Sequence, residues 1–97
     1  MRAATRYLKE RAPITGFELS GAVIRLQSAA PTAGGEVTIA GLVDGAIRQV
    51  FVSLAGDDYQ RAVQAHHQEL EVSVEGELVR EGRSYRLGNP RMFAIVE

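Results

Sequence analysis

Cysteine is absent from the 97 residues, which excludes disulfides, thiolate zinc sites, iron–sulfur clusters and cysteine nucleophiles together. Tryptophan is absent as well, and aromatic residues make up only 6% of the chain. Lysine occurs once, at Lys9, so arginine supplies nearly all of the positive charge. Eleven basic against twelve acidic side chains leave a net charge of −1. The chain lacks the strongly basic balance of a dedicated duplex-DNA binder, although a local basic patch remains open.

Long apolar runs are also missing. No run approaches the ~18 residues that a membrane-crossing helix needs, and the charged start, MRAATRYLKERAP, has no apolar segment of the kind found in secretory signals. We therefore expect a cytoplasmic protein without a membrane partner. The 45% of hydrophobic and 24% of charged residues are typical of a globular chain, and the length suits one domain.

Residues 1–12 are expected to form a short amphipathic helix, because Ala4, Tyr7 and Leu8 fall at helical spacing and Pro13 stops the run. A helix this short is marginal in water, so it must pack on something. Residues 13–97 make up the rest of a single domain. The abrupt end after Val96 suggests that this domain is excised from a longer protein.

Period-two alternation begins at Ile14 and predicts a long strand. Its apolar phase switches at Gly21-Ala22, which indicates a β-bulge, and a strand bent there can serve two sheets. Residues 28–35 (SAAPTAGG) are a loop by composition.

Asp44-Gly45 is a strong signal for a tight hairpin turn. Placing Val43 opposite Ala46 gives one β-branched face that points inward. The other face then points outward and pairs Thr38 with Phe51, Ala40 with Gln49, and Leu42 with Ile47.

A helix is expected to follow, with Asp57 as its N-cap and its end near His67–Gln68. Its inward stripe is Tyr59, Ala62, Val63 and His66.

The alternation of Leu70, Val72, Val74, Gly76 and Leu78 with polar residues predicts a half-buried strand. A turn at Glu81-Gly82 would place Leu78 opposite Tyr85 and Glu77 opposite Arg86. Asn89-Pro90 is expected to break the strand, with a final extended piece up to Val96.

This order of elements resembles the OB-fold, a five-stranded Greek-key barrel with a helix between its third and fourth strands. The resemblance rests on Gly21, on the helix from Asp57, and on Val72-x-Val74-x-Gly76-x-Leu78 followed by Tyr85-x-Leu87, which looks like the fourth-strand region of bacterial nucleic-acid-binding OB domains. Residues 87–91 are similar to the tail of uncharacterised actinobacterial OB-like domains. The fold class implied is all-β with short helices, residues 13–97 forming the barrel. Another small barrel or an open α+β sheet is the alternative.

The resemblance implies a non-enzymatic module that binds single-stranded nucleic acid or an oligonucleotide on the outer surface of strands two and three. Arginines could rim that face, although solvated surface is the alternative for them, and Phe51 could instead pack under the N-terminal helix. The candidate ligand-binding residues are Thr38, Leu42, Ile47, Gln49, Phe51, Arg25, Arg48, Arg80, Arg83 and Arg91.

The apolar character of the same face supports a second hypothesis, because a contiguous exposed apolar patch usually marks a partner. The partner could be another protein, an adjacent domain or a second copy in a homodimer. This hypothesis makes the chain a protein–protein or inter-domain docking module.

Enzymatic, metal and cofactor functions are not expected. His66 and His67 are adjacent, so on a helix their side chains diverge by about 100° and cannot easily share one ion. Glu71, Glu75 and Glu77 alternate along an exposed strand face rather than in the closed setting that catalytic carboxylates need. No serine stands in a G-x-S-x-G turn, and no set of nucleophile, base and orienting residue can be assembled.

Overall fold

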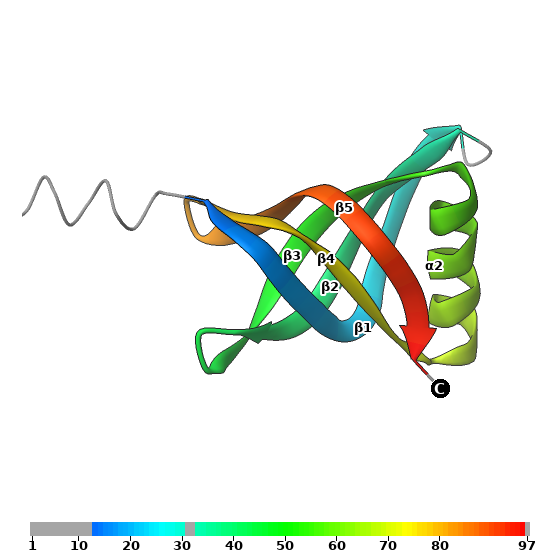
Figure 1. Ribbon diagram of the computed structural model, residues 1–97. Coiled ribbons are helices and arrows are strands. Elements are labelled where there is room, and N and C mark those ends of the chain that lie inside the picture. The colour runs from blue at the N-terminus through cyan, green and yellow to red at the C-terminus, as the bar shows by residue number, and fades with distance from the viewer. Residues whose placement is uncertain (1–12, 31–32, 97) are drawn as a thin grey trace, which may run out of the picture.

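The computed structural model describes residues 13–30 and 33–96, so the helix expected at residues 1–12 lies outside the described residues. Its elements in chain order are β1 (Ile14–Ala30), β2 (Gly34–Val43), β3 (Ala46–Ala55), α2 (Gly56–Gln68), β4 (Glu71–Glu81) and β5 (Ser84–Val96). The strands wind around one another, and the helix lies at one end of them (Figure 1).

The five strands form one sheet that closes on itself in the order β1-β2-β3-β5-β4. Every neighbouring pair is antiparallel except β3 and β5, which run parallel. The expectation of a mostly β domain with five strands and a helix between the third and fourth is confirmed. The open-sheet alternative is wrong, because β1 pairs with both β2 and β4.

β1 is the strand that closes the sheet. Its first half pairs with β4 and its second half with β2, as expected of a bent strand, and the shift in its pairing with β2 falls between Val23 and Arg25 rather than at Gly21-Ala22. Strand structure continues through Ala30 and resumes at Gly34, so the loop expected over residues 28–35 is shorter than the composition indicated.

The β2–β3 hairpin has the register that the sequence predicted. Val43 pairs with Ala46, Leu42 with Ile47 and Thr38 with Phe51. Asp44 and Gly45 have φ angles of 56° and 82°, the left-handed pair that a two-residue type I′ turn requires.

The β4–β5 hairpin differs from its predicted register. Glu81 pairs with Ser84 and Leu78 with Leu87, so Gly82-Arg83 forms the turn. From Glu77 to Glu81 each residue of β4 meets a partner two positions later than expected, and the offset grows beyond the register shifts that follow. The predicted break at Asn89-Pro90 is also wrong, because β5 continues to Val96. Irregular pairing with β4 and a left-handed φ of 48° at Asn89 bend the strand there, and a bulge of this kind accommodates a proline within a sheet.

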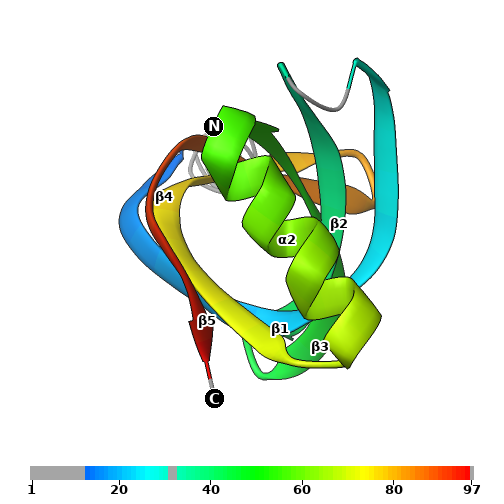
Figure 2. The ribbon, with the colours of Figure 1, turned by 90° about the vertical axis from the view of Figure 1, so that its right-hand side faces the viewer.

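α2 covers one end of the closed sheet (Figure 2), and Tyr59, Ala62 and Ala65 are its buried residues. Its predicted N-cap is wrong. The cap position lies two residues earlier, at Ala55, and no side-chain cap bond is made there. The Gly56 N–H instead donates to the Ala33 carbonyl, 3.4 Å away, so backbone from the β1–β2 connection replaces a capping side chain. Asp57 and Asp58 lie in the first turn, where acidic groups suit the helix dipole.

The interior of the sheet is filled by apolar residues from all five strands and from the helix. They are fully or almost fully buried, and this core fixes which face of each strand points outward. The core consists of Leu19, Val23, Val37, Ile39, Val43, Val50, Val52, Leu54, Tyr59, Ala62, Ala65, Val72, Val74, Leu78, Leu87 and Phe93.

Candidate functional site

A row of four side chains crosses the outside of β1, β2, β3 and β5. Arg25 pairs with Thr38, Thr38 with Phe51, and Phe51 with Arg86. Residues paired across strands share a face of the sheet, and the alternate residues of β2 and β3 are those of the core. The row crosses three strand-to-strand spacings of about 4.8 Å each along a sheet that curves and closes on itself. We call these four residues the Phe51 row.

Exposure varies along the Phe51 row. Arg25 is exposed and Phe51 is half-buried, so part of the ring meets solvent. Thr38 is only 3% exposed, so it presents little surface to a ligand. In residues 13–30 and 33–96, no side-chain hydrogen bond or ion pair engages the Arg25 guanidinium.

Arg86 carries the best-defined ion pair of the site. Its Nη2 donates to Glu36 Oε2 over 2.7 Å, and its Nε lies 3.5 Å from Glu81 Oε1. The predicted partner Glu77 is wrong, because Glu77 lies opposite Gly88 in the observed register. The hydrogen bond with Glu36 raises the pKa of Arg86; desolvation opposes this shift, and the charges of Glu36 and Glu81 add to it. The guanidinium therefore stays charged.

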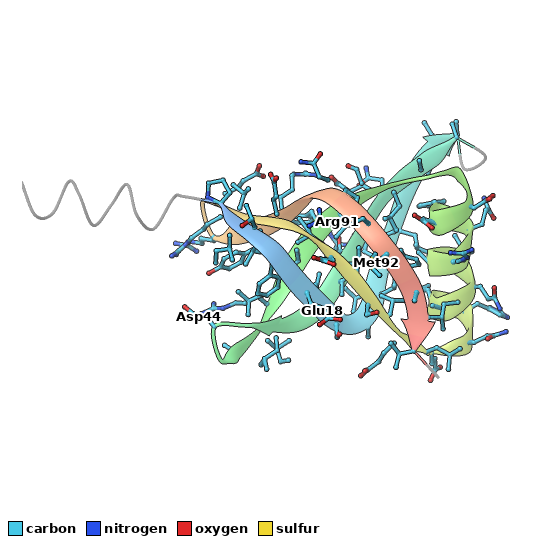
Figure 3. The ribbon with its side chains drawn as sticks, viewed as in Figure 1. Glu18, Asp44, Arg91 and Met92 are labelled. Atoms are coloured by element: carbon cyan, nitrogen blue, oxygen red, sulfur yellow. The ribbon has the colours of Figure 1, made fainter. Side chains whose placement is uncertain are left out.

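The turn end of the β2–β3 hairpin is apolar and exposed. Leu42 is 60% and Ile47 67% exposed, and the two face each other across the hairpin, whose tip carries Asp44 (Figure 3). Gln49, exposed, and Ala40, half-buried, form the next pair toward the Phe51 row. The apolar patch that the sequence predicted is therefore interrupted by a polar side chain.

The other candidate arginines lie outside the Phe51 row. Arg48 is exposed and pairs with Gly41, in the inward phase of β3 at the hairpin end. Arg80 and Arg83 belong to the β4–β5 hairpin, where the Arg80 guanidinium carbon lies 6.0 Å from the centre of the Tyr85 ring. Arg91 lies 3.3 Å from Glu75. The sequence reasoning therefore placed one arginine, Arg25, in the row.

Arg86 is the member of the row that sequence reasoning missed. Hydrophobic alternation could not reveal it, because its place depends on the parallel pairing of β5 with β3. The OB-fold resemblance implies a strand order. Pairing residues in that order could have directed attention to the neighbour of Phe51 on the fifth strand.

The outer face of β4 and of the first half of β1 is acidic. Glu71, Glu75 and Glu77 alternate along β4, and Glu18 of β1 pairs with Glu75. Arg91 on β5 and Glu18 on β1 lie to either side of β4 (Figure 3). Within the described residues, no group of three or more His, Asp or Glu side chains could hold a metal ion. His66 Nδ1 lies 2.7 Å from the Val23 carbonyl oxygen, which occupies that ring nitrogen.

No helix in the described part of the chain combines the length and apolar character needed to span a membrane. Comparisons of the chain with protein-family models, with curated proteins and with solved structures gave no match.

Proposed function

We propose that this chain is a non-enzymatic OB-fold module that binds single-stranded nucleic acid through the Phe51 row. The closed order β1-β2-β3-β5-β4, with β3 parallel to β5 and a helix between β3 and β4, supports the OB-fold assignment. Modules with this fold bind oligonucleotides on the face formed by strands two and three, which is the face that carries the row.

The chemistry of the row supports the same ligand. Proteins that bind single strands combine an aromatic platform for the bases with positive charge along the backbone. Phe51 offers a partly exposed ring, and Arg25 and Arg86 provide a guanidinium at each end of the row. A base stacked on Phe51 would leave the neighbouring phosphates within reach of these two side chains. This arrangement is the observation that carries the proposal.

The test is fluorescence anisotropy with a labelled oligonucleotide of about 15 nucleotides, the upper part of the site sizes known for one OB-fold. The affinity should fall as salt is added, because phosphate contacts release counterions. Phe51→Ala should weaken binding roughly 5- to 150-fold, the range that the loss of one stacked base covers.

Ile47→Ala is the matched control. It also shortens an apolar side chain on the outer face of β3, and Ile47 is more exposed than Phe51, but it lies two rows away from the ring and cannot stack a base. Its binding should equal that of the unaltered chain. Absence of binding by the unaltered chain at low salt would overturn the proposal.

The exposed Leu42–Ile47 pair favours a second function, contact with another copy of the chain through the hairpin end. A standard protein interface buries about 800 Å² on each partner, several times what two side chains present, so this surface alone fits only a weak contact. Sedimentation velocity should show a concentration-dependent dimer that Leu42→Ser removes. A monomer at every concentration would refute this second function.

A further inference from the structure

The Glu36–Arg86 ion pair spans β3, the strand that carries the half-buried Phe51. Glu36 lies on β2, two residues before Thr38, and pairs with Ser53 of β3. Arg86 lies on β5 and pairs with Phe51 of β3. The 2.7 Å bond between their side chains therefore crosses β3 diagonally, from the Phe51 row to the next row. A carboxylate thus occupies the guanidinium of the residue that pairs with Phe51 on β5.

We infer that Glu36 is a specificity-determining residue that competes with phosphate for Arg86 and so favours strands that carry bases over base-free polyanions. The inference rests on the proposed function of the Phe51 row. A phosphate that binds Arg86 must replace the Glu36 carboxylate, so one anion is exchanged for another and the net electrostatic gain is small. Only a ligand that also stacks a base on Phe51 adds a favourable contact of its own.

The geometry favours this role over a purely structural one. Both side chains are 35% exposed, and ion pairs this close to solvent add little to folding stability. Arg86 also has a second carboxylate, Glu81, at 3.5 Å. Without the charge of Glu36, Arg86 therefore keeps its contact with Glu81 but loses its closest ion-pair partner.

The experiment compares Glu36→Gln with Glu18→Gln, which makes the same charge change on β1, where the exposed Glu18 pairs with Glu75 of β4. The probes are the labelled oligonucleotide and, as a competitor, inorganic polyphosphate of similar total charge. E36Q should bind the oligonucleotide roughly two- to fivefold more tightly, because ion pairs of this exposure are weak. The affinity of E36Q for polyphosphate should rise by a larger factor, so the ratio of oligonucleotide affinity to polyphosphate affinity should be lower in E36Q than in the unaltered chain.

Two further measurements identify Arg86 as the group that is released. The slope of log affinity against log salt should steepen by up to about 0.7 in E36Q, because Arg86 then neutralises a phosphate without giving up a carboxylate. The double variant E36Q/R86A should bind no more tightly than the unaltered chain. E18Q should change either affinity less than twofold. Glu75, the partner of Glu18 on β4, lies four residues from Val79, the partner of Arg86, which is about 13 Å along the strand, and salt screens charges beyond about 10 Å.

The outcomes separate the two proposals. If the unaltered chain binds the oligonucleotide, and E36Q either binds both probes no more tightly than the unaltered chain or gains the same factor for both, the inference is overturned and the proposed function stands. If neither the unaltered chain nor any variant binds the oligonucleotide, the proposed function fails. If the affinity for polyphosphate is also the same in E36Q and in the unaltered chain, the inference is overturned too. An equal gain in E18Q also overturns it, since net charge alone would then account for the effect. Circular dichroism checks that E36Q folds. If it does not fold, Glu36→Asp, whose carboxylate is one methylene further from Arg86, replaces it and should give a smaller gain in affinity for the two probes. If Glu36→Asp gives no gain in affinity, the inference is overturned.

Discussion

Gly21→Ala should destabilise the closed sheet strongly, because β1 passes close to the backbone of β2 at this residue. Gly21 pairs with Gly41 of β2 and with Val72 of β4. A Cβ atom built on Gly21 would lie 2.1 Å from the Ala40 carbonyl oxygen and 2.8 Å from the Gly41 Cα. Even close carbon–oxygen contacts between strands measure about 3.3 Å or more, so the two backbones must separate by more than about 1 Å.

The expected loss follows from which atoms can move. Overpacked side chains usually cost about 1–3 kcal/mol, because rotamers and nearby groups give way. At Gly21 the obstructing atoms are backbone, and a methyl group has no rotamer that avoids them. We therefore expect the upper end, about 3 kcal/mol, a large part of the 5–15 kcal/mol that keeps a typical domain folded. For a chain of this length the Tm should fall by roughly 12–24 °C.

Urea unfolding followed by circular dichroism measures the loss, and Gly88→Ala is the control. At Gly88 the nearest atom to an added Cβ is the Glu77 carbonyl oxygen at 3.8 Å, an ordinary contact. The control should leave the free energy of unfolding unchanged or raise it by about 0.4–1 kcal/mol, because alanine restricts the unfolded chain. Equal effects of the two substitutions would refute the reasoning.

Two further predictions follow from burial and charge. Leu87→Ala shortens a side chain that is 1% exposed and should lower the free energy of unfolding by about 2–5 kcal/mol. Ile47→Ala changes a residue that is 67% exposed and should lower it by less than about 0.5 kcal/mol in the same urea titration. Equal losses would contradict the assigned faces of β3 and β5. Because the bond with Glu36 raises the pKa of Arg86, any stabilisation from the charged guanidinium is present below the ordinary arginine pKa and is lost only as pH rises through the raised value. The difference in unfolding free energy between the unaltered chain and Arg86→Ala should therefore be the same at about pH 7 and about pH 10, and a difference that disappears by the higher pH would contradict this assignment.

The β2–β3 hairpin could be predicted in full because its turn and its alternation agree. Asp44-Gly45 supplies the left-handed pair that a two-residue turn needs. A shift by one residue would have turned the buried Ile39 and Val50 outward. Leu42, Ile47 and Phe51 were therefore assigned correctly to the outer face.

The β4–β5 register could not be settled in this way. Moving the turn from Glu81-Gly82 to Gly82-Arg83 changes each partner by two residues, so every side chain keeps its face and Leu78 meets Leu87 instead of Tyr85. Alternation cannot distinguish these registers. The turn decides, and Gly82, with a φ of 64°, takes its first position.

The helix start and the position of Arg86 depended on distant parts of the chain. The Ala33 carbonyl that accepts from Gly56 lies 23 residues before it (56 − 33), and no local capping pattern reports such a contact. Arg86 joins the Phe51 row only through a parallel strand pair. Local patterns thus gave the elements and most faces, while the pairing of distant strands determined which charges surround the ring.

The parallel contact between β3 and β5 has a consequence for the order of folding. Over the part of the chain that the structure describes, it comprises three residue pairs, from Val50–Tyr85 to Val52–Leu87, and joins positions 35 apart (85 − 50). Contacts between distant segments are slow to form, because the intervening loop must first be closed. The Phe51 row is therefore completed only when β3 pairs with β5, so a partly folded chain would not present it. A ligand bound across Phe51 and Arg86 would stabilise the pairing of β3 with β5 and slow unfolding of the folded protein.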